Sequence, residues 1–248
     1  MNNAPVRTVS DAKRDFYAHH TRPINSIYRR VVDELMVEMH LLSVNVDFAY
    51  DPIYALGIVT TFDRFMTGYL PENDTSSIFN ALCRSINSTP EHYRGDAEAV
   101  KAGVNGMSLD DLKGQFDNLG EGGEGLRGIL AKVANQDKFK YSRPFGIGLY
   151  TLVEAAASAD ALKDKESVEA LFKELGEKLN MSTEKLQKDI ELYRSNLEKF
   201  AQAQEVMKDM LAADRKKREE RKKAAEAEAE TITETVAVAP EAGEPSDS

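Results

Sequence analysis

The stretch that decides the fold is Leu192–Lys223, "LYRSNLEKFAQAQEVMKDMLAADRKKREERKK". Apolar residues recur through its first half at steps of three and four, the spacing of one face of an α-helix. After Leu211 the apolar residues stop, and a basic run begins at Arg215. The sequence therefore predicts one long helix whose apolar face ends before the helix does.

A heptad seam extends this pattern toward the amino terminus. Its members are spaced 4-3-4-3-4-3-4 and comprise Leu186, Ile190, Tyr193, Leu197, Phe200, Gln204, Met207 and Leu211. A seam this narrow suits one or two neighbouring helices, as in a coiled coil. Two interpretations stay open: the seam packs on the chain's own bundle, or its distal half binds a partner or a second copy.

The basic run is a candidate contact with anionic lipid headgroups, with solvated helix surface as the alternative. Its candidate membrane-surface residues are Arg215, Lys216, Lys217, Arg218, Arg221, Lys222 and Lys223. The net charge of the chain is −10, but seven of the acids lie after Lys223, where no base occurs. Because the remainder is nearly balanced, we expect no nucleic-acid binding, and the acidic tail competes with lipid for the basic run.

Helix start signals divide the rest of the chain. A capping residue followed by proline is typical of a first turn, as at Asp51 and Thr89. We predict an all-α, multi-helix bundle over residues 1–181, a long carboxy-terminal coiled-coil-like helix over 182–230, and a disordered acidic tail over 231–248. The expected helices of the bundle begin near Ser10, Thr21, Asp51, Asp74, Thr89, Ser108, Ser142 and Asp164.

Two features of the bundle are expected to shape its packing. The second helix carries one buried face, consisting of Ile24, Ile27, Tyr28, Val31, Leu35, Met39, Leu42 and Val46. The helix after Ser142 contains Gly146, Gly148 and a run of small residues at 155–159, which allow another helix to approach closely. Gly120–Gly125 is expected to form a mobile loop.

Sequence signals for chemistry are weak. "GEGGEG" at 120–125 matches the dinucleotide-binding pattern, but it follows no strand and its glutamates would repel a pyrophosphate. Glu34, Glu38 and His40 share a helix without the spacing of a bundle metal site, and surface charge or a local ion pair explains them better. The single cysteine, Cys83, is expected in the core of a protein from a reducing compartment. We therefore expect no catalytic residues, cofactor or metal.

The amino terminus has no apolar run and carries early acids, so we expect neither a signal nor a transit peptide. The longest apolar stretch, Ile53–Val59, is far shorter than the roughly 20 residues that span a bilayer. Any membrane contact is therefore expected at the surface.

Three blocks resemble the thylakoid formation protein family, which is also described as a photosystem II biogenesis and repair factor. The first begins "RTVSDAKRDFYAHHTRPINSIYRRVVDELMVEMH" at Arg7, the second is "KFKYSRPFGIGLYTLVE" at 138–154, and the third is "DIELYRSNLEKFAQAQEVMKDML" at 189–211. They occur in the family's order, and the resemblance covers most of residues 7–221. It is weak in the glycine-rich middle and absent from the tail.

The resemblance implies a non-catalytic, all-helical, peripheral protein on the cytoplasmic side of the thylakoid membrane in a cyanobacterial cell. It implies a role in maintaining photosystem II through association with thylakoid FtsH-type protease complexes, with photosystem II assembly intermediates as further candidate partners. By analogy we expect partner contacts in "FYAHHTRPINSIYRR" and along the seam. The candidate partner-binding residues are Tyr17, Arg22, Tyr28, Arg29, Arg30, Tyr193, Leu197, Phe200, Met207 and Leu211.

Two rival interpretations remain beside this one. The first is a helical bundle that binds a pigment, another cofactor or a metal. The second is a self-assembling structural protein at the photosynthetic membrane, with the seam joining two copies.

Overall fold

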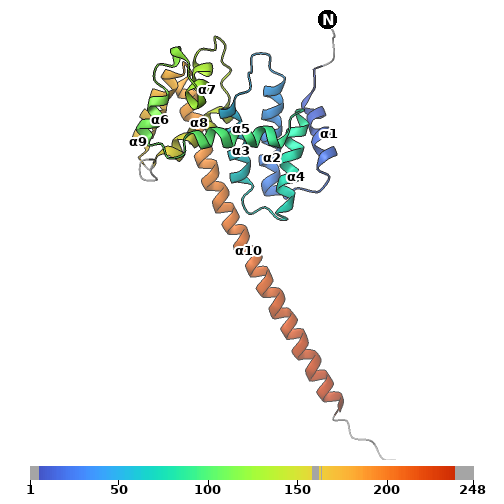
Figure 1. The fold of residues 1–248 in the computed structure, drawn as a ribbon. Coiled ribbons are helices and arrows are strands. Elements are labelled where there is room, and N and C mark those ends of the chain that lie inside the picture. Colours follow the sequence, from blue (N-terminus) through green and yellow to red (C-terminus); the bar gives the residue numbers. More distant parts are fainter. Residues whose placement is uncertain (1–5, 158–161, 163, 238–248) are drawn as a thin grey trace, which may run out of the picture. The chain divides into compact units, whose positions relative to one another are not determined.

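The structure is a computed structural model that describes residues 6–157, 162 and 164–237, with side chains as far as Lys223. Every regular element of these residues is helical, and no strand is assigned among them (Figure 1). The elements are α1 (Val9–His19), α2 (Ser26–Ser43), α3 (Pro52–Phe65), α4 (Asn73–Ser85), α5 (Pro90–Gly103), α6 (Leu109–Gln115), the short 3₁₀ helix η1 (Leu119–Glu121), α7 (Gly125–Ala134), α8 (Arg143–Ala156), α9 (Lys165–Lys178) and α10 (Thr183–Ala237). The all-α fold class with a long final helix is confirmed.

The chain forms two compact units that divide inside α10, between Leu197 and Glu198. The first turns of α10 thus belong to unit 1, whereas the prediction counted the long helix separately, from residue 182. The physical reason is burial, because Leu186, Ile190 and Tyr193 are each less than 5% exposed. Helix α10 is assigned to Ala237, seven residues beyond the expected Glu230. The rest of the tail lies outside the described residues.

Several helices begin directly after the capping residues that the sequence predicts. Asp51 Oδ1 accepts from the amides of Ile53 and Tyr54 at 2.9 Å each, and Pro52 occupies the first turn. Thr89, Ser108, Ser142 and Asp164 cap α5, α6, α8 and α9 in the same way. Each of these side chains satisfies amides that the first helical turn leaves without a partner.

Three other starts differ from the prediction. Thr8, rather than Ser10, caps α1, because its hydroxyl and the Asp11 carboxylate form a reciprocal capping box. Helix α2 begins after Asn25 rather than near Thr21, and it ends at Ser43, which leaves Val46 96% exposed instead of buried. Asp74 caps nothing: it lies inside α4, where its side chain is buried and pairs with Arg22.

The glycine-rich middle contains more helix than the sequence predicted. The expected loop at 120–125 contains the end of η1 and the first residue of α7, a helix that was not predicted. The sequence signal for α7 is weak because glycines, which are poor helix formers, lie at the start of this helix. Gly122, Gly123 and Gly125 have positive φ angles of 77°, 156° and 57°, which glycine adopts readily.

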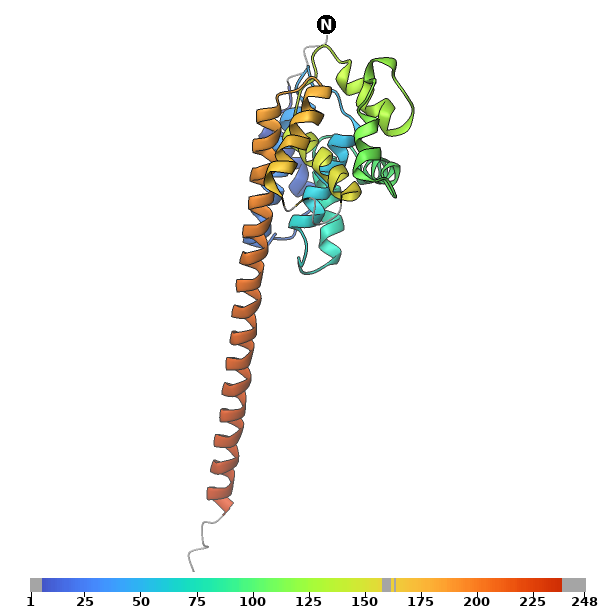
Figure 2. The same ribbon diagram turned by 90° about the vertical axis from the view of Figure 1, so that its left-hand side faces the viewer.

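The core of unit 1 centres on α3, which packs against α8 on one side and α5 on another, while α1 packs against α4. Helix α3 is apolar almost all round, as a central helix should be. Cys83 is fully buried in α4, and its burial raises the pKa of the thiol to about 12, so it is a core residue as expected. Helix α9 lies beside the start of α10 (Figure 2), where Thr183 and Leu186 approach Gly176.

Candidate functional site: a groove on unit 1

A groove of about 1060 Å³ lies on unit 1. Its walls come from three segments far apart in the sequence: helix α2, the turn into α8, and the first turns of α10. The lining residues are Ser26, Arg29, Arg30, Asp33, Glu34, Val37, Glu38, Leu41, Leu42, Tyr141, Ser142, Arg143, Lys185, Asp189, Leu192 and Asn196. We call this concavity the α2–α10 groove.

The α2 wall of the groove combines charged pairs with an apolar stretch. Arg29 lies 3.8 Å from Asp33, and Arg30 lies 2.9 Å from Glu34, each at the i, i+4 spacing of neighbours on a helix surface. One to two turns later Val37 and Leu41 are 37% and 54% exposed.

The opposite wall is held by polar contacts to Asp189 on α10. The Tyr141 hydroxyl donates to the Asp189 carboxylate at 3.0 Å, and Arg143 lies 4.0 Å from the same side chain. Lys185 sits over the Tyr141 ring at 5.1 Å from its centroid. Burial and the neighbouring Asp189 charge raise the pKa of Tyr141, so the phenol stays neutral and keeps donating. Leu192 completes this wall and is 46% exposed.

Glu38 is the exception among the acidic residues of the groove. It forms no hydrogen bond and no ion pair within the described part of the chain, and desolvation raises the pKa of its carboxyl. Arg143 lowers this pKa and Asp189 raises it, so the two neighbours partly cancel. Glu34, Glu38 and His40 were predicted to be surface charges or members of a local ion pair. Glu34 does form a local ion pair, but His40 is a core residue, only 2% exposed.

The predicted amino-terminal partner residues do not form one surface. Arg29 and Arg30 line the groove, whereas Tyr17 and Arg22 do not. Tyr17 is half-buried with its ring edge against Phe16, and Arg22 forms an ion pair of 2.7 Å with Asp74. Tyr28 is only 2% exposed and packs on Tyr69, so its side chain lies in the core of unit 1. Its place among i, i+3 and i+4 apolar residues already indicated the core.

The predicted seam also divides by burial. Tyr193 is 3% exposed within unit 1, between Phe65 and Tyr150, so it supports the bundle and is not available to a partner. Leu197, Phe200 and Met207 are half-buried, and Leu211 is 65% exposed. Leu192 lies outside the heptad positions, which is why the seam analysis missed it.

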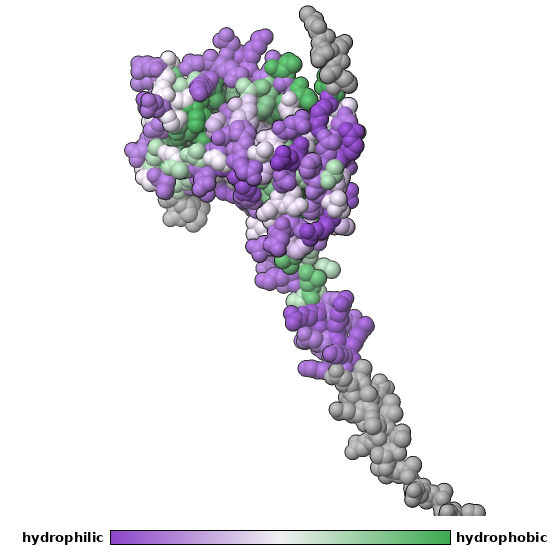
Figure 3. Space-filling model, turned by 45° about the vertical axis from the view of Figure 1, so that its right-hand side comes forward, coloured by the Kyte–Doolittle hydropathy of each residue, from purple (hydrophilic) through white to green (hydrophobic). Residues whose placement is uncertain are grey.

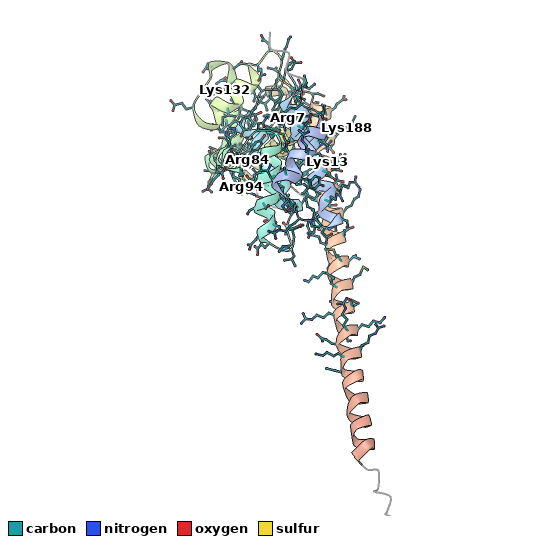
Figure 4. All side chains as sticks on the ribbon, turned by 90° about the vertical axis from the view of Figure 1, so that its right-hand side faces the viewer. Arg7, Lys13, Arg84, Arg94, Lys132 and Lys188 are labelled. Carbon is teal, nitrogen blue, oxygen red and sulfur yellow. The ribbon has the colours of Figure 1, made fainter. Side chains whose placement is uncertain are left out.

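Exposed apolar and basic residues follow one another along unit 2. Val206, Met210 and Leu211 are each more than half exposed, and a hydrophobic band interrupts the polar surface of α10 in Figure 3. The basic run follows, with Arg215 paired to Glu219 at 3.2 Å and Arg218 to Asp214 at 3.0 Å. On unit 1, by contrast, basic side chains are spread over different elements (Figure 4), as shown by Arg7, Lys13, Arg84, Arg94, Lys132 and Lys188.

The described residues contain no group of three or more His, Cys, Asp or Glu side chains placed to hold a metal ion. Among the same residues no helix combines the length and apolarity that a bilayer crossing requires. The fold and its surface define a helical protein with a large open groove and a long final helix.

Comparison with known proteins identifies the family. The model of the family described as "Thylakoid formation protein" matches residues 8–222, and the chain belongs to this family. Similar proteins named Protein Thf1 come from Nostoc punctiforme, 57% identical over 90% of this chain and 94% of the relative, and Acaryochloris marina, 48% identical over 88% of each. A solved structure, that of Psb29 at 1.55 Å, is 42% identical with a TM-score of 0.74 over 86% of this chain and 98% of that one.

Proposed function

We propose that this protein is a non-catalytic accessory factor for photosystem II biogenesis and repair and for thylakoid membrane formation. It acts by binding thylakoid FtsH-type protease complexes, and photosystem II assembly intermediates are further candidate partners. The observation that carries the proposal is the family match over residues 8–222, whose description names thylakoid formation. The match spans both units, so the proposal covers the groove and the distal helix together.

The surface of the protein supports a role in binding. A groove lined by exposed Val37, Leu41 and Leu192 suits a macromolecular segment better than a small substrate, because its apolar walls face solvent. The exposed Val206, Met210 and Leu211 of unit 2 offer a second apolar surface. We place the protein at the cytoplasmic side of the thylakoid membrane as a peripheral protein, with the basic run contacting anionic headgroups.

The test is copurification of the intact protein with the FtsH complex from cyanobacterial thylakoids, together with recovery of photosystem II after strong light in a deletion strain. We expect copurification and slowed recovery. Variants Phe200→Gln, Met207→Gln and Leu211→Gln probe the distal seam without disturbing the core of unit 1. Val46→Gln, at a 96% exposed position outside the groove, is the matched control.

Two results would contradict the proposal. Normal recovery of photosystem II in the deletion strain would remove the role in repair. Absence of the protease from the purified complex would remove FtsH as the partner. A visible absorption band or bound metal in the purified protein would instead favour a cofactor-binding bundle, and a dimer mass in solution would favour self-assembly.

A further inference from the structure

The α2–α10 groove gathers exposed apolar side chains that the fold leaves uncovered. Nine large hydrophobic side chains of the described residues are exposed, and three of them, Val37, Leu41 and Leu192, line this groove. Val37 and Leu41 are four residues apart, so they lie on one face of α2. A surface where apolar side chains collect beside polar ones is typical of a binding site.

Three ion pairs match most of the charges of the groove, and Lys185 and Glu38 lie outside these pairs. Lys185 is exposed and lies over the Tyr141 ring. The bases Arg29 and Arg30 are matched on α2 by Asp33 and Glu34, one turn further on. Asp189 receives the Tyr141 hydroxyl and lies beside Arg143. Glu38 remains without a hydrogen bond or an ion pair among the described residues, and its side chain is half-buried.

A carboxylate in this position is costly unless a partner compensates it. Burial of an ionised carboxyl group without a hydrogen bond or counter-charge destabilises the folded state. A cation supplied from outside would relieve the desolvation of Glu38 and pair with it in a partly dry site, where charged hydrogen bonds are strong. The neighbours of Glu38 on α2 are Val37 and Leu41, which would pack against apolar side chains beside that cation.

We propose that the α2–α10 groove binds a short amphipathic segment of a partner protein, with a Lys or Arg side chain on Glu38 and flanking apolar side chains on Val37, Leu41 and Leu192. This inference rests on the proposed function, in which the protein acts by binding other proteins, and it names the chemistry of the partner segment. Helix-in-groove binding of this kind uses apolar residues at i, i+3 or i+4 and i+7 as anchors.

Charge complementarity selects this occupant over an acidic segment. An acidic side chain next to Glu38 would add a second uncompensated carboxylate, and like charges across an interface are strongly unfavourable. Arg29 and Arg30 could attract an acidic residue at the edge of the groove, but Asp33 and Glu34 already pair with them. Lys185 is exposed to water, where an ion pair contributes little.

The experiment is selection from a displayed library of random helical peptides against the intact protein, followed by affinity measurement on variants. We expect enrichment of peptides with one Lys or Arg flanked by apolar residues. Glu38→Gln, which keeps the shape of the side chain, should weaken the selected peptides by at least about tenfold, because one charged hydrogen bond is lost. Glu38→Lys should reverse the preference toward peptides with Glu or Asp at that position.

Controls keep the result independent of folding. Leu41→Gln should weaken binding, whereas Val46→Gln, at an exposed position outside the groove, should not. Each variant is compared with the wild-type protein by thermal unfolding. If Glu38→Lys does not fold, Glu38→Gln alone decides the question.

Several results would overturn the inference. These are selection of acidic peptides, selected peptides that bind Glu38→Gln and Leu41→Gln as well as the wild-type protein, or no selected peptide at all. A dimer of the intact protein that dissociates on Leu41→Gln would make a second copy the occupant and overturn it too. Copurification with the protease is measured separately, so the proposed function stands when only the peptide selection fails.

Discussion

Gly57 of α3 and Gly148 of α8 meet where the backbones of these two helices touch. A Cβ atom on Gly57 would lie 2.9 Å from the Gly148 nitrogen and 1.7 Å from the Pro144 carbonyl oxygen. A Cβ atom on Gly148 would lie 1.9 Å from the Ile53 carbonyl oxygen. The two glycines therefore permit a helix crossing that any side chain would prevent.

We expect Gly57→Ala and Gly148→Ala to destabilise unit 1 by about 3 kcal/mol each, the upper part of the usual range for overpacking. Backbone atoms are the obstacle, and they cannot rotate away as a side-chain end can. Urea unfolding gives the free energy of unfolding for each variant. Gly95→Ala is the matched control, because Gly95 lies in α5 with open space around it, and alanine should stabilise that helix by about 1 kcal/mol. Equal effects at all three positions would contradict the crossing.

The sequence predicted the role of Gly148 in this helix crossing but not the role of Gly57. Gly148 stands in a helix with other small residues, and that pattern favours close approach. Gly57 is surrounded in the sequence by large apolar residues such as Tyr54, Leu56 and Ile58. This pattern predicts an ordinary apolar helix and gives no sign of a close helix crossing. Only the tertiary pairing of α3 with α8 gives Gly57 its role, and no local pattern contains that information.

Asp51 supplies both a cap and a buried charge. Two amides donate to it at 2.9 Å each, yet burial outweighs them and raises its pKa to about 6. Asp51→Ala should cost about 1 kcal/mol through loss of the cap. Asp51→Asn keeps an acceptor without the buried charge, so it should be more stable than the wild-type protein at pH near 7, and this advantage should shrink as pH falls.

The pH dependence of these two variants distinguishes the cap from the charge. The folded pKa of Asp51 is above the unfolded value of about 3.9, so the folded state binds the proton more tightly. The contribution of Asp51 to stability should therefore rise as pH falls from about 6 to about 4. Urea unfolding across this range should show the rise in the wild-type protein relative to Asp51→Asn. Parallel pH curves for the two proteins would refute the raised pKa.

His20 should produce the opposite trend. Its Nδ1 lies 3.0 Å from the Ser77 hydroxyl and its Nε2 has no hydrogen-bond partner among the described residues. Desolvation is the main cause that lowers the pKa of His20. The charge of Asp74 raises this pKa, and the charge of Arg22 lowers it. Because the folded pKa is below the unfolded value of about 6.5, stability should be complete above that pH and fall as pH decreases through it.

His20→Asn tests this trend while keeping a polar atom near Ser77. The difference in unfolding free energy between the wild-type protein and His20→Asn should stay constant from pH about 8 to 7 and shrink below about 6.5. A difference that grows on acidification would show that protonated His20 is stabilised by Asp74 instead.

The candidate site was harder to predict than the fold. Capping residues such as Asp51 and Ser142 act locally, so their sequence signals are reliable. The groove instead depends on α2, the turn at Tyr141 and the start of α10 coming together. Arg29 and Arg30 were selected by resemblance, but Leu41 and Leu192 fall outside both predicted apolar patterns. Leu41 and Leu192 are large apolar residues that belong to no predicted buried face, and this property could have marked them as surface contacts.

Seam residues should separate into structural and surface members. Tyr193 is buried between Phe65 and Tyr150, and its hydroxyl lies 3.4 Å from Arg64. Tyr193→Ala should therefore destabilise unit 1 by about 3 kcal/mol, the range for a large buried aromatic. Leu211→Ala, at a 65% exposed position, should change the free energy of unfolding by less than about 0.5 kcal/mol. A large loss at Leu211 would place it in the packed core of the molecule.

The basic run provides the test of membrane contact. Lys216, Lys217 and Lys223 lie outside the Arg215–Glu219 and Arg218–Asp214 pairs. If they face anionic lipid, replacing all three with Gln should weaken binding to vesicles containing anionic lipid by roughly a hundredfold, since each base near such a surface contributes about 1 kcal/mol. Vesicle sedimentation of the intact protein measures this change.

Lys13→Gln, Lys132→Gln and Lys188→Gln together form the matched control, because they remove the same charge from separate elements of unit 1. Binding through the basic run should also weaken steeply as salt increases, because exposed charges are screened beyond about 10 Å at 0.1 M salt. Equal losses in the two triple variants would mean that the vesicle senses net charge and not this segment. Unchanged binding in both would remove anionic lipid as its contact, and the exposed Val206 and Met210 would then be the next residues to change.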